Sequence, residues 1–139
     1  IASLNAIGSM EYAVRVLGSQ LIVVMGHTNC GAIKGACDDI EMDHVNTILD
    51  HIRPAVDAEV ETIEERNSTN KKFVGNVTRL NVGHHLDFVM HKSSIVSTMV
   101  RNGAIGICGA IYDVETGKVE FIEYNHQKQP SYEKFAAKA

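Results

Sequence analysis

The sequence is poor in cysteine, proline and tryptophan, with three, two and none of these residues in 139. Cys30, Cys37 and Cys108 are too few, and odd in number, for a disulfide framework. We therefore expect free or metal-bound thiols in a reducing compartment, the cytoplasm. The longest apolar run, Leu21–Met25, is far too short to cross a bilayer, and no stretch is typical of an amphipathic anchor. No membrane association is expected.

Blocks of like charge are also absent, which argues against nucleic acid as a partner. Lys and Arg number 13 and Asp and Glu number 17, for a net charge of −4. Hydrophobic residues make up 45%, which excludes intrinsic disorder and suits a single domain over residues 1–139. No signal-peptide pattern is visible, and because the chain starts at Ile1 rather than Met, we expect it to begin partway into a longer gene product.

The spacing of apolar residues predicts helices around a strand in the first two thirds of the chain. Ser9 is expected to cap a short helix that ends before Gly18. Leu21–Met25 has no polar side and predicts an inner parallel strand covered on both faces. Further helices are expected over 32–36, from Asp43 to about Ile63 with a kink or break at Pro54, over 73–92, and from Ser93 or Ser94 to Val100.

The last third predicts two more strands. Ala104–Val114 is a second buried strand, and Val119–Tyr124 returns antiparallel to it after a tight turn. The polar tail from Asn125 is expected to wrap a surface or a partner. The fold class is therefore α/β, a mostly parallel sheet flanked by helices with a C-terminal antiparallel strand. Three strands are few for such a sheet, so the chain looks short of sheet partners.

The segment Gly26-His27-Thr28-Asn29-Cys30-Gly31 follows the first strand, at the end where α/β proteins place their sites. The His27 imidazole and the Cys30 thiolate suit Zn²⁺, and Gly26 and Gly31 allow a sharp turn and a close approach. Taken alone this H-x-x-C spacing is a weak signal. Such a pair more often serves packing, and a zinc site needs three or four ligands.

The other histidines have plainer interpretations. Neighbouring helical residues point about 100° apart, so His84 and His85 do not readily share one ion. For these two and His91 we favour a solvated or core-lining role, with a proton shuttle as the alternative. His44 and His51 are expected on a partly exposed helix face.

Several motifs occur in the order known from the β-class carbonic anhydrases. They are Gly8–Val14, Leu21–Ala32 and Gly109–Val119, and Asn76-Val77 early in a helix matches another recurring feature. Through these motifs nearly the whole chain resembles that family.

The resemblance implies a zinc enzyme that reversibly hydrates carbon dioxide to bicarbonate by a zinc-bound hydroxide, as a homodimer or tetramer. In that family one His and two Cys hold the zinc. His27 and Cys30 match the second and third of these ligands, and Gly31 falls in the substrate pocket. Tyr12 and Phe88 are candidates to line a carbon dioxide pocket at a subunit boundary, with core packing as the default.

One departure from the family is large. The family's first zinc cysteine and an Asp–Arg pair lie in an upstream Cys-x-Asp-Ser-Arg segment, which residues 1–139 lack. Neither Cys37 nor Cys108 is expected to replace that cysteine, so no catalytic residue is assigned in this chain. We expect an N-terminally incomplete domain that is inactive alone and is a hydratase only in the complete protein.

Two alternatives stay open. One is a natural short homologue without catalytic competence, acting as a zinc- or bicarbonate-binding protein or as an oligomerisation module. The other is a hydrolase of carbon disulfide or carbonyl sulfide on the same scaffold.

Overall fold

A computed structural model describes residues 1–122 and 124. In this part of the chain the elements are, in order, α1 (Leu4–Arg15), β1 (Leu21–His27), α2 (Gly31–Cys37), α3 (Val45–Leu49), α4 (Arg53–Ala58), α5 (Lys71–Lys92), α6 (Ser94–Arg101), β2 (Gly106–Tyr112) and β3 (Val119–Ile122). The predicted tail from Asn125 lies outside the described residues. None of the helices described is long and apolar enough to span a membrane.

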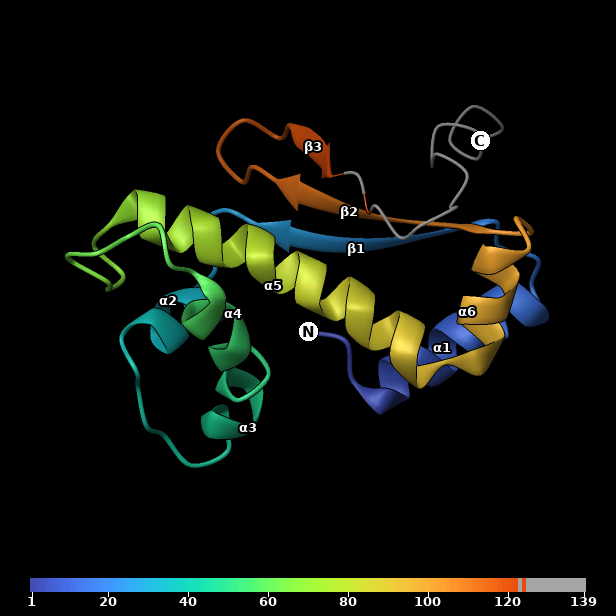
Figure 1. The fold of residues 1–139 in the computed structure, drawn as a ribbon, viewed down its shortest axis with the longest axis horizontal. Helices are drawn as coiled ribbons and strands as arrows, with labels where there is room; N and C mark the ends of the chain where they lie inside the picture. The colour runs from blue at the N-terminus through green and yellow to red at the C-terminus, as the bar shows by residue number, and fades with distance from the viewer. Residues whose placement is uncertain (123, 125–139) are drawn as a thin grey trace.

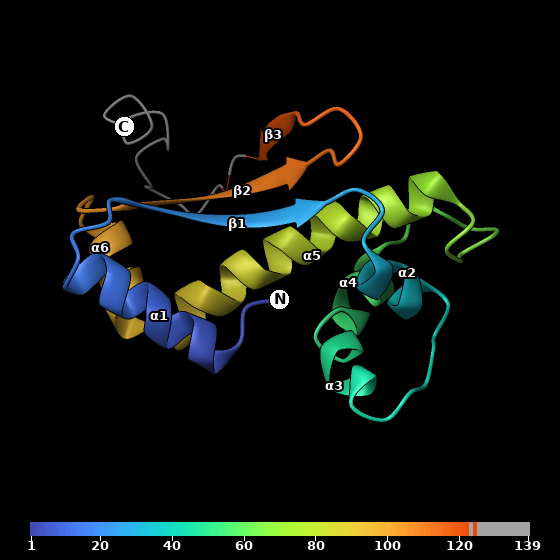
Figure 2. The same ribbon diagram turned by 180° about the vertical axis from the view of Figure 1, so that it is seen from behind.

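The three strands form one mixed sheet in the order β1-β2-β3. β1 and β2 run parallel, with Leu21 opposite Gly106 and His27 opposite Tyr112. β3 returns antiparallel and places Val119 opposite Tyr112. This arrangement is the predicted parallel sheet with a C-terminal antiparallel strand. In Figures 1 and 2 the labelled helices lie on one side of the sheet.

α5 is the longest helix described and runs beneath β1 and β2 (Figure 1). Two glycines of the sheet let it approach closely. A Cβ at Gly26 would lie 2.9 Å from the Val82 Cγ2, and one at Gly109 would lie 2.8 Å from the Val82 Cγ1. Real carbon atoms do not pack this tightly, so any larger residue would push α5 away from the sheet.

The helices bury two separate hydrophobic clusters. The sheet core joins α1, α5 and α6 to the sheet and contains Ala2, Ile7, Val14, Ile22, Val82, Leu86, Val89, Met90, Val96, Val100, Ile105, Ile107 and Ile111. The helical core joins α2, α3 and α4 to the first turns of α5 and contains Ile33, Ala36, Cys37, Leu49, Ile52, Ala55, Phe73, Val74 and Val77. Figure 2 shows these two groups of helices at opposite ends of α5.

The structure corrects the prediction that Leu21–Met25 is covered on both faces. β1 is an edge strand of the described sheet, and its residues alternate between α5 and the opposite face. Ile22 is buried, whereas Val23 and Met25 on the opposite face are 37% and 51% exposed. An apolar run shows that both faces of a strand can be buried, but it does not show whether the chain contains the elements that would cover them. The predicted shortage of sheet partners agrees with this open edge.

The start of α1 also differs from prediction. The helix begins six residues earlier than expected, and Ser3 caps it by accepting a hydrogen bond from the Ala6 amide at 3.3 Å. Ser9 lies inside the helix and donates to the Asn5 carbonyl. The buried face begins at Ile7, before the serine that the apolar spacing suggested.

The predicted long helix from Asp43 to Ile63 is two short helices, α3 and α4. His44, not Asp43, precedes α3, and Pro54 lies in the first turn of α4, where its missing N–H leaves no bond unmade. The chain leaves helical geometry at Glu59, and Val60 and Ile63 beyond it are 80% and 89% exposed. Apolar spacing alone therefore carried this helix five residues past its observed end at Ala58, whereas its start differs by one residue and the predicted break near Pro54 is present between α3 and α4. The helices over 71–92 and 94–101 agree with prediction, with Ser93 capping the second through the Val96 amide.

Candidate metal centre

The loop that carries the H-x-x-C pair connects β1 to α2. β1 ends at His27, and α2 begins at Gly31, one residue earlier than expected. Asn29 turns the chain between them with a φ of +58°, a left-handed conformation that asparagine tolerates better than most residues. Cys30 occupies the position just before α2 and its side chain caps no amide.

Hydrogen bonds join this loop to the end of β2. The Thr28 amide donates to the Tyr112 carbonyl at 2.9 Å, and the Val114 amide donates to the Thr28 Oγ1 at 3.1 Å. The Asn29 side-chain amide donates to the Glu115 carboxylate at 3.3 Å. The carboxyl ends of two parallel strands therefore hold the loop, so that His27 and Cys30 start from a fixed backbone.

The turn after β2 is stabilised by one carboxylate. Asp113 accepts bonds from the amides of Glu115 and Thr116, and these bonds hold the pKa of Asp113 below its ordinary value. Gly117 supplies the positive φ of +71° that the turn requires. Asp113 therefore has a structural role beside the loop.

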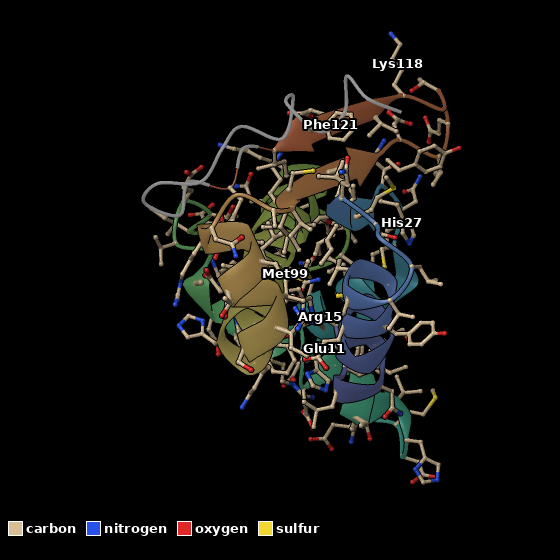
Figure 3. All side chains as sticks on the ribbon, turned by 90° about the vertical axis from the view of Figure 1, so that its right-hand side faces the viewer. Glu11, Arg15, His27, Met99, Lys118 and Phe121 are labelled. Carbon is tan, nitrogen blue, oxygen red and sulfur yellow. The ribbon has the colours of Figure 1, made fainter. Side chains whose placement is uncertain are left out.

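His27 is exposed and has a defined tautomer. Its Nδ1 lies 2.9 Å from the Thr28 carbonyl oxygen, which can only accept, so in the neutral ring Nδ1 carries the proton and Nε2 keeps its lone pair. A backbone carbonyl on one ring nitrogen is a common partner of a metal-binding imidazole. Gly26 packs on α5, so the alternation of the strand places His27 on the opposite face, and its partner in the register of β2 is Tyr112. His27 is labelled in Figure 3.

Cys30 and Gly31 differ in what surrounds them. Cys30 is a free, half-buried thiol that packs against the helical core. Gly31 is exposed, and a Cβ there would meet nothing within 4 Å, so crowding does not require glycine at this position. Its assignment to the substrate pocket stays a prediction.

The other two cysteines are buried away from the loop. Burial raises the pKa of Cys37 to about 11 and raises that of Cys108. Cys108 pairs with Val23, four residues and about 13 Å along the strand from the position beside His27. Cys37 ends α2, about 10 Å along the helix from Cys30. These positions give neither thiol a place as a third ligand.

The donor set is chemically suited to zinc but incomplete. One imidazole nitrogen and one sulfur are typical zinc ligands, and a catalytic site needs three protein ligands and an open position. Within residues 1–122 and 124, no three His, Cys, Asp or Glu side chains are grouped so that they could hold a metal ion. The described residues therefore do not complete a zinc site, and no catalytic step follows from them alone.

A cavity beside the loop is not lined by the H-x-x-C pair. It has a volume of about 320 Å³, and its walls are Thr28, Asn29, Lys34, Ser68, Thr69, Lys71, Val74, Gly75, Asp113 and Glu115. Neither His27, Cys30 nor Gly31 is among them. The predicted substrate pocket is therefore not this cavity.

His84 and His85, the histidine pair on α5, differ in burial, and the core-lining role applies to His85. His84 is half-buried, whereas His85 is 2% exposed and its ring centroid lies 5.6 Å from that of His84. Burial, as the largest cause, lowers the pKa of His85 to about 4. A helical stripe through Val82, His85 and Val89 marks His85 as the inward member, a signal the sequence pattern did contain.

Tyr12 and Phe88, the candidates for a carbon dioxide pocket, lie in different surroundings. Tyr12 is 57% exposed on α1 and so does not take the default core position. Phe88 is half-buried against the sheet core, with its ring edge-on to His85 at 6.4 Å. Neither position tests the pocket assignment.

Comparisons with known proteins agree on one family. The sequence profile of a family described as "Carbonic anhydrase" matches residues 1–119. The chain is 29% identical over 117 residues to "Carbonic anhydrase 2" of Mycobacterium tuberculosis, covering 81% of this chain and 53% of the relative. It is 32% identical over 111 residues to "Carbonic anhydrase 1" of Escherichia coli O157:H7, covering 80% and 50%. The chain thus spans about half the length of these curated relatives.

Solved structures show the same fold. The β-carbonic anhydrase CafA of Aspergillus fumigatus superposes with a TM-score of 0.73 at 23% identity, covering 90% of this chain and 59% of that one. The Coccomyxa β-carbonic anhydrase in complex with acetazolamide gives a TM-score of 0.72 at 25% identity, covering 86% and 54%. The predicted α/β fold and the predicted resemblance are confirmed.

Proposed function

The chain belongs to the β-class carbonic anhydrase family, and from that membership we propose that it is part of a zinc-dependent enzyme that reversibly hydrates carbon dioxide to bicarbonate. In this reaction water adds an oxygen to the carbon of CO₂ and a proton is released. Zinc, when bound, supplies the Lewis acidity that makes water a nucleophile near neutral pH.

One observation carries the proposal. The His27 Nδ1 donates to the Thr28 carbonyl, which leaves Nε2 as the free nitrogen three residues before a free thiol. In a loop held to two strands, this is the tautomer that a metal-binding imidazole needs. His27 and Cys30 would hold the metal, and Asn29, bonded to Glu115, would keep the loop in place.

The remaining parts of the site are proposed to come from outside the described residues. The family resemblance implies a Cys-x-Asp-Ser-Arg segment, with the third ligand and an Asp–Arg pair. The open edge of β1, next to the loop, is available for further sheet pairing. We therefore expect the 139-residue chain alone to show little or no hydration activity.

Assembly and location are proposed on similar grounds. Exposed apolar side chains on α1 and β1, among them Leu4, Tyr12 and Met25, favour association into a homodimer or tetramer. A solved structure similar to this chain, from Sordaria macrospora, is one of two β-carbonic anhydrases described as tetrameric. Three free cysteines favour a reducing compartment such as the cytoplasm.

The test joins intact mass, metal content and turnover. The protein is purified from its natural source, its mass is compared with 15.2 kDa, and zinc per chain and CO₂ hydration are measured. The proposal expects a larger mass, stoichiometric zinc and rapid hydration, with neither zinc nor hydration in a 139-residue preparation. A natural product of 15.2 kDa without zinc would overturn it.

A second function has its own support. Because the described residues group no three zinc donors, a non-catalytic zinc- or bicarbonate-binding protein or oligomerisation module also fits them. Such a protein would bind zinc weakly or not at all and would not hydrate CO₂. A hydrolase of carbon disulfide or carbonyl sulfide would attack a similar carbon, and parallel assays with the three substrates separate it from a hydratase.

A further inference from the structure

Two buried polar atoms of α5 have no hydrogen-bond partner within the described residues. They are the Asn81 Oδ1 and the His85 Nε2. Residues four apart on a helix share a face, with Cβ atoms about 5–6 Å apart. Buried polar atoms in native proteins nearly always have partners, and so two on adjacent turns of one helix call for a common explanation.

The polarity of the two atoms can be assigned. The Ala2 amide donates to the His85 Nδ1 at 3.3 Å, so Nδ1 carries the lone pair and Nε2 carries the proton of the neutral ring. His85 thus has a free N–H donor, and Asn81, one turn earlier, has a free carbonyl acceptor. A guest that both accepts and donates satisfies the two atoms together.

We propose that Asn81 and His85 bind one internal water molecule and, with Ala2, form a latch that holds residues 1–3 on α5 while His85 is neutral. Water is the guest of the right size and polarity, because internal waters typically bridge such otherwise unpaired groups. The rings of His51 and Phe88 also pack near His85, each with its centroid 6.4 Å from that of His85. The latch is separate from the metal loop and does not depend on the proposed function.

Protonation of His85 would open the latch. A proton added to Nδ1 points at the Ala2 N–H, so two donors face each other where a hydrogen bond stood. The side chains whose charges act on the ring are His84 and His51, and no carboxylate is among them. Nothing described therefore compensates a buried imidazolium, and residues 1–3 are released as it forms.

The first test is the NMR state of the ring in the wild-type chain at neutral pH. We expect the ¹⁵N shifts of His85 to report a proton on Nε2, and that proton to exchange slowly with solvent and to show a cross-peak to a long-lived water. Asn81→Ala removes the water cross-peak. A proton on Nδ1, or a slowly exchanging Nε2 proton without any water cross-peak, overturns the proposal.

The second test follows amide protection of residues 4–8 as the pH is lowered from 7 to 4. Wild type should lose protection by up to about tenfold per pH unit in the acidic part of this range, as for a release linked to one proton. His85→Gln keeps a neutral donor and acceptor and should hold protection constant, while the matched control His84→Gln should follow wild type. Glu11, which accepts from Ser93, also ties α1 to α6 and is intact in both variants. Loss of protection in His85→Gln equal to that in wild type would refute the latch.

Discussion

His27 and His85 show how one residue type acquires opposite chemistry in two regions of this molecule. Each places Nδ1 against the backbone. In the loop after β1, the partner of His27 is a carbonyl, so Nε2 is left with a lone pair on an exposed ring. In the middle of α5, the partner of His85 is an amide N–H, so Nε2 is left with a proton in a buried one.

The difference teaches that the backbone group, not the residue, decides what each ring can bind. An exposed lone pair is available to a metal, whereas a buried N–H can only donate to a small internal guest. Burial opposes protonation of His85 as well, since a charged ring there lacks both solvent and a counter-ion. Variants of the two histidines should therefore have effects of different kinds, on metal content in one region and on acid stability in the other.

The largest effect is expected in the loop. In a full-length version of the protein, His27→Ala or Cys30→Ser should lower zinc from about one equivalent per chain to near zero, because a catalytic zinc needs three protein ligands. Hydration should fall by more than about 100-fold, since loss of even an outer partner of a ligand costs about 10–100-fold. Zinc is measured by elemental analysis and hydration by stopped flow.

His44→Ala is the matched control for this prediction. His44 is exposed before α3 and belongs to neither of the two regions compared. Its variant should keep wild-type zinc and activity. Unchanged metal content in His27→Ala or Cys30→Ser would remove the loop from the zinc site.

The next effect belongs to His85 and concerns global stability. Its pKa is lowered from 6.5 to about 4, so between these pH values the unfolded chain binds a proton that the folded chain refuses. The contribution of His85 is complete above pH 6.5 and is lost as the pH falls toward 4, by on the order of 3 kcal/mol. Urea unfolding at pH 7.5, 6, 5 and 4 should show this loss in wild type and a smaller one in His85→Gln. Equal slopes in the two proteins would contradict it.

A third prediction concerns the packing that joins the two regions. Gly26 precedes His27 and lies against Val82 of α5, so Gly26→Ala should destabilise the fold by about 1–3 kcal/mol through overpacking. Gly109→Ala, with Val82 at 2.8 Å, should cost a similar amount. On the exposed side of α5 a Cβ at Gly75 meets nothing within 4 Å, so Gly75→Ala should stabilise by up to about 1 kcal/mol. Thermal unfolding measures all three. A stabilising effect of Gly26→Ala would show that α5 moves away from the sheet without loss of stability.

The sequence predicted helices and strands best where an uninterrupted apolar run or a clear turn motif defines the element. The solid apolar runs around Ile22 and Ile107 gave both parallel strands, and the turn chemistry at Gly117 gave the antiparallel return. The pattern failed where apolar side chains are exposed. Val60 and Ile63 continue a helical spacing, yet the chain there bends around buried Glu59, which accepts hydrogen bonds from Thr62 and Arg66.

The candidate site was predictable only in part, for a related reason. The spacing of His27 and Cys30 is local, so the sequence alone marks them. The bonds that hold their loop link positions 86 residues apart, as in Asn29 to Glu115, and no local pattern contains them. The tautomer of each histidine likewise depends on a backbone partner, which for His85 lies 83 residues away at Ala2.

The smallest expected effect is the difference in stability between alanine variants of Ser3 and Ser9, two serines near the segment that contacts His85. Ser3 accepts from the Ala6 amide at the start of α1, so Ser3→Ala should destabilise by about 1 kcal/mol, the usual cost of a lost cap. Ser9, which the apolar spacing suggested as the cap, only donates to the Asn5 carbonyl within the helix, so Ser9→Ala should change stability by less than about 0.5 kcal/mol. Urea unfolding of the two variants at pH 7.5 decides between them. The reverse order would show that Ser9, and not Ser3, caps α1.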